Sequence, residues 1–209
     1  MNEIERTQQR TRSYWYCDGI GELVGGLAMA LVGFPMIAAA RTGIDMLSTI
    51  SLMAMILLFP ASARVVRYLK DRITHTRTGY VKYPAPTMSK RRKGILFSLF
   101  MGVAIAMLIS LWGGEYTLDG IMGKALLIGS GSAITVAFAI RAIKLSMPRM
   151  FVGAVATATA LVISMVEGLG FAEGIGLLLT ALGAASVITG TVTLVIYIQR
   201  HPKTPSENP

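Results

Sequence analysis

Two carboxylates and two guanidinium groups have the types and spacing to form a polar site. Asp18 and Glu22 are four residues apart, so they share one face of a helix that has begun by this point. Arg64 and Arg67 follow the second apolar stretch of the chain. We predict that these four residues form a cluster at the inner mouth of a helical bundle, where the acids could hold a cation or a proton. In the structural alternative, the acids cap a helix and form salt bridges to Arg64 or Arg67.

A second group of candidate residues is basic and aromatic and lies between positions 64 and 93. This segment holds half of the 20 Lys and Arg residues of the chain. Basic segments beside a membrane attract anionic headgroups by about 1 kcal/mol per Lys or Arg. We expect no nucleic acid as a partner, because the basic residues lie at the membrane plane without a recognised nucleic-acid motif. The candidates for lipid or partner contact are Arg77, Tyr80, Lys82, Lys90, Arg91, Arg92 and Lys93.

Catalytic and cofactor chemistry finds little support in the sequence. The chain has no phosphate-binding G-x-x-x-x-G-K-[ST] loop, no G-x-G-x-x-G after a strand and no H-E-x-x-H motif. His75 and His201 stand alone outside the apolar stretches, and Cys17 has no second cysteine to pair with. We therefore expect neither an enzyme nor a cofactor or metal site.

The elements that position these residues are apolar helices. Hydrophobic residues make up 53% of the 209 residues, and charged residues only 15%, against about 25% in soluble domains. A helix needs roughly 20 apolar residues to cross a bilayer. The sequence therefore predicts an all-α, polytopic membrane bundle of six transmembrane helices in a single domain, 1–209. The expected spans are 20–40, 44–63, 94–112, 120–140, 150–166 and 174–198.

The basic residues predict the direction of these spans. Cytoplasmic loops carry an excess of Lys and Arg. With six spans, every Lys and Arg except Arg41 and Lys124 lies on one side. We therefore expect a plasma (inner) membrane protein of a prokaryote, with the lipid bilayer as its surroundings. Both termini and the basic loop 64–93 would be cytoplasmic.

The loop lengths divide the six spans into three in-out-in hairpins. The outer helix starts are similar to one another, since a polar residue precedes Gly-Ile each time, which favours either a triplicated hairpin or a shared need for helix caps. These starts are Thr42-Gly43-Ile44, Asp119-Gly120-Ile121 and Glu173-Gly174-Ile175.

Small residues recur at four-residue spacing on the first and last spans, a pattern that lets helices pack closely in lipid. Three roles are open for these small residues: packing within the bundle, a homodimer interface, or contact with a partner membrane subunit. Hydroxyl residues on the last two spans line a polar path or bond to their own helix carbonyls. The small residues are Gly21, Gly25, Gly33, Ala181, Ala185, Thr189 and Thr193, and the hydroxyl residues include Thr157, Ser164 and Thr180.

Two short segments resemble parts of small bacterial multi-pass membrane proteins of uncharacterised function. One is Tyr14-Trp15-Tyr16 followed by Asp18-Gly19 and Glu22, and the other is Arg77-Thr78-Gly79-Tyr80-Val81. The resemblance implies a prokaryotic inner membrane and implies no activity.

The expected function is that of a channel or facilitator-type transporter for a small solute or ion. The alternative is a non-catalytic membrane subunit or scaffold whose basic cytoplasmic loop docks a partner or anionic lipid. A polar cavity between the first, second, fifth and sixth spans would favour transport. A tightly packed, dry bundle would favour the scaffold.

Overall fold

The computed structural model describes residues 16–74 and 120–202, and within these ranges it is all-helical, without strands. The first helices form a hairpin, and the later ones follow each other closely in sequence. The elements are α2 (Ile20–Thr42), α3 (Asp45–Leu69), the π-helical turn η1 (Lys70–Thr74), α6 (Ile121–Leu145), α7 (Met150–Val166) and α8 (Phe171–Arg200).

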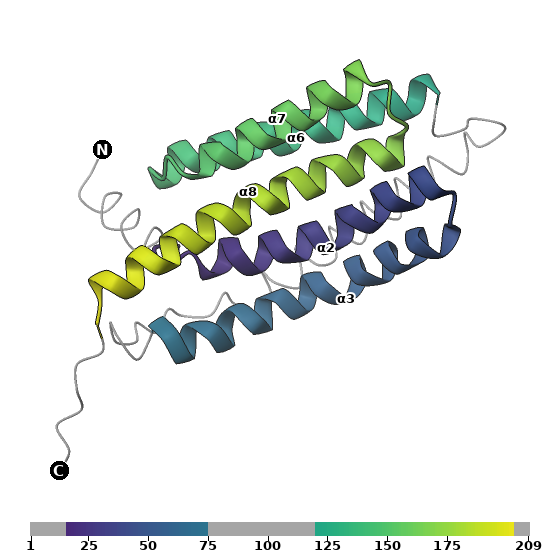
Figure 1. The fold of residues 1–209 in the computed structure, drawn as a ribbon. Helices are drawn as coiled ribbons and strands as arrows, with labels where there is room; N and C mark the ends of the chain where they lie inside the picture. The colour runs from purple at the N-terminus through teal and green to yellow at the C-terminus, as the bar shows by residue number, and fades with distance from the viewer. Residues whose placement is uncertain (1–15, 75–119, 203–209) are drawn as a thin grey trace, which may run out of the picture.

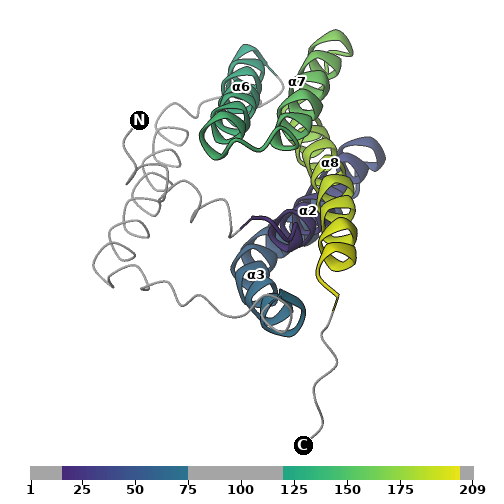
Figure 2. The same cartoon turned by 90° about the vertical axis from the view of Figure 1, so that its left-hand side faces the viewer.

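The helices lie roughly side by side, in the order α6 and α7, α8, α2 and α3 (Figure 1). The view turned by 90° shows α2 between α8 and α3 (Figure 2). We name the two ends of this bundle after α2. The Asp18 end holds the start of α2, η1 and the end of α8, and the Arg41 end holds the turn after α2 and the start of α8.

Four of the described helices are long and apolar enough to cross a membrane, which suggests a membrane protein. Their positions agree with four of the expected spans, and α7 matches a fifth but has only 17 residues. The expected span 94–112 lies outside the described residues. The four helical segments are Ile20–Thr42, Met46–Thr74, Met122–Leu145 and Phe171–Arg200.

The most extensive helix contact in the described part joins α2 to α8 through glycine. A Cβ atom built on Gly26 would lie 2.7 Å from the carbonyl oxygen of Gly183, and the reverse distance is also 2.7 Å. Real Cβ atoms essentially never come this close to backbone. The same relation holds for Gly33 against Gly176, so the two backbones touch where any side chain would separate them.

A third glycine pair ends this contact at the Asp18 end. Gly19 faces Gly190, and a Cβ atom on Gly19 would lie 2.5 Å from the Gly190 carbonyl oxygen. Gly19 also has φ +70°, in the left-handed region that side chains disfavour. The pairs recur every seven residues on both helices, the spacing at which a helix returns to nearly the same face.

The expected four-residue stripe on the first span is therefore only partly correct. Gly33 lies in the contact, but Gly21 and Gly25 have no described atom near their Cβ positions. On α8, Ala181 instead packs beside the apolar cluster of Leu127, Ala160 and Leu178, which joins α6, α7 and α8.

The expected helix caps at the outer turns are not found where they can be tested. The residue before α3 is Ile44 and the residue before α8 is Gly170, and neither has a side-chain cap. Because α8 begins at Phe171, Glu173 lies inside its first turn rather than before it.

Candidate functional site

Asp18 is the most enclosed carboxylate of the Asp18 end, and both of its oxygens have partners. Its Oδ1 accepts a hydrogen bond at 3.2 Å from the backbone N–H of Ile20, the first residue of α2. Its Oδ2 lies 3.0 Å from Lys70 Nζ and accepts a hydrogen bond from Thr74 Oγ1 at 2.9 Å. The side chains of Lys70 and Asp18 are only 4% and 1% exposed. Asp18 thus ties α2 to η1 by a buried ion pair.

The partner of Asp18 differs from the expected Arg64 or Arg67, which are both exposed. In an antiparallel hairpin, residues at equal distance from the turn lie level with one another. The turn between α2 and α3 is at Gly43 and Ile44, which places Lys70, and neither arginine, level with Asp18. The helical stretch also continues past Leu69 into η1, where Lys70 and Thr74 both reach the same carboxylate oxygen.

Glu22 is paired with Arg149, from the segment between α6 and α7, rather than with the arginines of α3. Arg149 Nε lies 3.0 Å from Glu22 Oε1. Its Nη1 donates to Thr193 Oγ1 of α8 at 2.9 Å, and its Nη2 donates to the backbone carbonyl of Tyr16. One guanidinium group therefore joins α2, α8 and the start of α7. Only arginine has the planar set of donors to make these bonds together.

Glu22 retains one unsatisfied atom. Its Oε2 is buried without a well-aligned hydrogen-bond donor in the described part of the chain, although the Thr189 hydroxyl interacts with the Glu22 carboxylate. Burying such an oxygen has a free-energy cost unless another group binds it.

Cys17 lies beside both ion pairs and is half-buried. Burial and the neighbouring Asp18 carboxylate raise the pKa of the Cys17 thiol, although Lys70 and Arg149 act in the opposite direction. A raised pKa keeps the thiol protonated at neutral pH, so Cys17 is a poor nucleophile.

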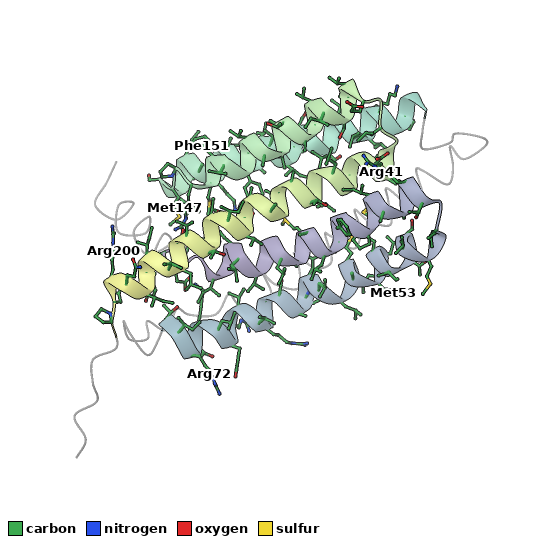
Figure 3. All side chains as sticks on the ribbon, in the orientation of Figure 1. Arg41, Met53, Arg72, Met147, Phe151 and Arg200 are labelled. Carbon is green, nitrogen blue, oxygen red and sulfur yellow. The ribbon has the colours of Figure 1, made fainter. Side chains whose placement is uncertain are left out.

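The Arg41 end has one ion pair of a different kind. Arg41 Nε lies 2.8 Å from Glu173 Oε1, and the Arg41 side chain is 70% exposed. This pair joins the end of α2 to the first turn of α8, and Figure 3 labels Arg41 at this end of the bundle.

The hydroxyl groups of the last two helices bond mainly within their own helices. Thr157, Ser164, Thr180, Thr189 and Thr193 each donate to the carbonyl four residues earlier. These hydroxyls are satisfied without water or a passing solute.

The remaining candidates, Arg77, Tyr80, Lys82, Lys90, Arg91, Arg92 and Lys93, lie outside the described residues, so the proposed lipid or partner contact stays a prediction. The sequence interpretation missed Lys70 and Arg149 as ion partners. It also missed the seven-residue glycine spacing, which is visible in the sequence at Gly19, Gly26 and Gly33 and at Gly176, Gly183 and Gly190.

No metal-binding group of three or more His, Cys, Asp or Glu residues occurs in the part of the chain that the structure describes. No protein-family model matches the sequence, and neither the search of curated proteins nor that of solved structures found a match.

Proposed function

We propose that the protein is a non-catalytic membrane subunit or scaffold whose basic, cytoplasmic end binds anionic lipid headgroups. The observation that carries the proposal is the glycine contact between α2 and α8. It brings two backbones together at Gly19, Gly26 and Gly33 of α2, so the first and last spans have no room between them for a solute.

The charges of the Asp18 end support the same function. Its two ion pairs and the hydrogen bond from Arg149 to Thr193 hold α2, η1, α8 and the start of α7 in one arrangement. Arg64, Arg67 and Arg72 remain exposed at this end. Under the proposed orientation they face the cytoplasmic leaflet together with the basic segment 75–93, where anionic lipids attract them.

The second candidate is the channel or facilitator, and the buried Oε2 atom of Glu22 favours it. A buried carboxylate oxygen without a well-aligned donor could bind a proton or a small cation. In this function, Asp18 and Glu22 would form the inner mouth of a path formed with other spans. The exposed arginines Arg64 and Arg67 would then line its entrance rather than pair with the acids.

The test of the scaffold function uses the whole protein in lipid nanodiscs that contain phosphatidylcholine with or without phosphatidylglycerol. We expect phosphatidylglycerol to raise the melting temperature of the wild type. A variant with Lys90, Arg91, Arg92 and Lys93 all changed to Gln should lose most of this increase. The control variant, Lys124→Gln, removes a charge from the opposite end of the bundle. It should show the same increase in melting temperature as the wild type. An equal increase in all three proteins would contradict the proposal.

A flux assay in proteoliposomes separates the two candidates. A scaffold should release no more trapped proton or monovalent cation than empty liposomes do. Flux that disappears in Glu22→Gln, at unchanged melting temperature, would instead establish the facilitator.

A further inference from the structure

A hollow of ≈ 520 Å³ lies at the Asp18 end, beside the last turns of α8. Its described wall includes Arg149 from the start of α7 and Thr193, Ile196, Tyr197 and Arg200 from α8. Figure 3 shows Arg200 and Met147, the neighbour of Arg149, at this same end of the bundle. None of its described lining residues belongs to the basic segment 64–93.

The charge of this wall favours an anion. Two guanidinium groups, Arg149 and Arg200, line the hollow, and no carboxylate is among its described lining residues. The nearby acids already have partners, because Asp18 is bound to Lys70 and Glu22 is bound to Arg149. Arg149 already donates to Glu22, Thr193, the Tyr16 carbonyl and Met147 Sδ, so the net positive charge of the wall and most of the donors for a phosphate group come from Arg200, with one N–H of Arg149 beside it.

Arg149 is held in place before any ligand arrives. Its hydrogen bonds to Glu22, Thr193 and the Tyr16 carbonyl orient the guanidinium plane from three sides. A donor whose orientation is fixed loses less conformational freedom on binding than a flexible surface side chain does.

The remainder of the described wall combines the apolar side chain of Ile196 and the ring of the buried Tyr197 with Cys17, Thr193 and His201. Ile196 is 43% exposed. The Tyr197 ring lies against the His201 ring with centroids 4.6 Å apart. A wall with arginines on one part and aliphatic and aromatic carbon on another matches a phosphate ester attached to hydrocarbon. Free inorganic phosphate would leave the apolar part without a contact.

We propose that this hollow binds the phosphate group of one anionic phospholipid, with Arg149 and Arg200 on the phosphate and Ile196 and Tyr197 against the glycerol and acyl carbons. The inference rests on the proposed function, because it requires the Asp18 end to lie at a lipid headgroup layer. Basic pockets between transmembrane helices bind anionic headgroups in this way.

The test is native mass spectrometry of the whole protein in mild detergent, titrated with dioleoyl-phosphatidylglycerol or dioleoyl-phosphatidylcholine. We expect one phosphatidylglycerol to bind before any phosphatidylcholine. Arg200→Gln should weaken that first binding about fivefold, which corresponds to about 1 kcal/mol for one basic residue at the membrane surface. The matched control is Arg141→Gln, which removes an exposed arginine near the same end but outside the hollow. This variant should change the affinity for the first phosphatidylglycerol less than twofold, about 0.4 kcal/mol.

Equal weakening by Arg200→Gln and Arg141→Gln would overturn the site, because it would reveal diffuse attraction by net charge. A titration with inorganic phosphate alone forms the second arm. Binding of free phosphate that depends on Arg200 and displaces the lipid would overturn the lipid as the ligand.

Ile196→Ser provides a second variant that leaves both arginines in place. It should weaken phosphatidylglycerol binding through the apolar part, and unchanged lipid affinity would contradict the proposed contact with carbon.

The loop variant of Lys90 to Lys93 distinguishes failure of this inference from failure of the proposed function. First-lipid binding that survives this variant and falls in Arg200→Gln supports the hollow, even if the loop contributes nothing. The opposite pattern retains the proposed function and rejects the hollow.

Discussion

The two ends of α2 are tied to neighbouring elements by ion pairs in opposite environments. At the Arg41 end, the pair with Glu173 leaves the arginine in contact with its surroundings. At the Asp18 end, the carboxylate and ammonium of Asp18 and Lys70 are enclosed by protein. An enclosed charge depends on its partner far more than an exposed one does, because nothing else solvates it. The difference implies that the bundle is fastened mainly at the Asp18 end.

The largest change in the free energy of unfolding should come from removing one partner of the enclosed Asp18–Lys70 pair. Lys70→Met leaves the Asp18 carboxylate buried with its two remaining hydrogen bonds and should cost about 3–5 kcal/mol of the free energy of unfolding. Titration with SDS in mixed micelles, followed by circular dichroism, measures this change. The matched control is Lys124→Met, an exposed lysine of α6.

A double variant tests whether the loss comes from the unpaired charge. Asp18→Asn combined with Lys70→Met removes both charges and should recover part of the stability lost in Lys70→Met. If Lys70→Met lowers the free energy of unfolding no more than Lys124→Met does, the bundle is not fastened mainly at the Asp18 end.

A smaller loss of stability is expected from changing the glycine contact, which lies between the two ends. Gly26→Ala places a methyl group against the backbone of Gly183 and should destabilise the bundle by roughly 1–3 kcal/mol, because the helices must separate. Gly129→Ala, where no described atom lies near the new Cβ position, should gain up to about 1 kcal/mol from helix propensity. Thermal unfolding in detergent compares the two variants. A gain of stability in both variants would show that helix propensity, and not the contact with Gly183, decides the effect of Gly26→Ala.

The smallest effect should come from the Arg41 end. Arg41→Gln removes the exposed pair with Glu173 and should change the free energy of unfolding by only about 0–1 kcal/mol. The small difference between wild type and variant should shrink further when the salt concentration is raised, since ions screen exposed charges. A loss as large as that of Lys70→Met would mean that both ends fasten the bundle equally.

Hydropathy and helix length were enough to predict the described helices, because membrane-crossing segments must be long and apolar. The starts of α2 and α7 were placed correctly at Ile20 and Met150. The in-out-in arrangement of six spans stays a prediction, with the 94–112 segment outside the described residues.

The ion partners were harder to predict because they depend on contacts between distant segments. Asp18 and Glu22 were identified as important acids, but charge alone could not choose among the many basic residues of the chain. The choice of Lys70 follows from the antiparallel hairpin and from η1. The choice of Arg149 requires the packing of α8 on α2, since Thr193 and Glu22 share its guanidinium.

The equal spacing of the glycine pairs makes the α2·α8 contact periodic along its axis. If α8 slid along α2 by one seven-residue interval, glycine would again meet glycine at two of the three pairs. Close packing alone therefore allows more than one register. The charges do not repeat in this way, and Arg41 meets Glu173 while Arg149 bridges Glu22 and Thr193 at one offset only. The glycines thus determine how closely the first and last helices approach, and the ion pairs select the register in which they do so.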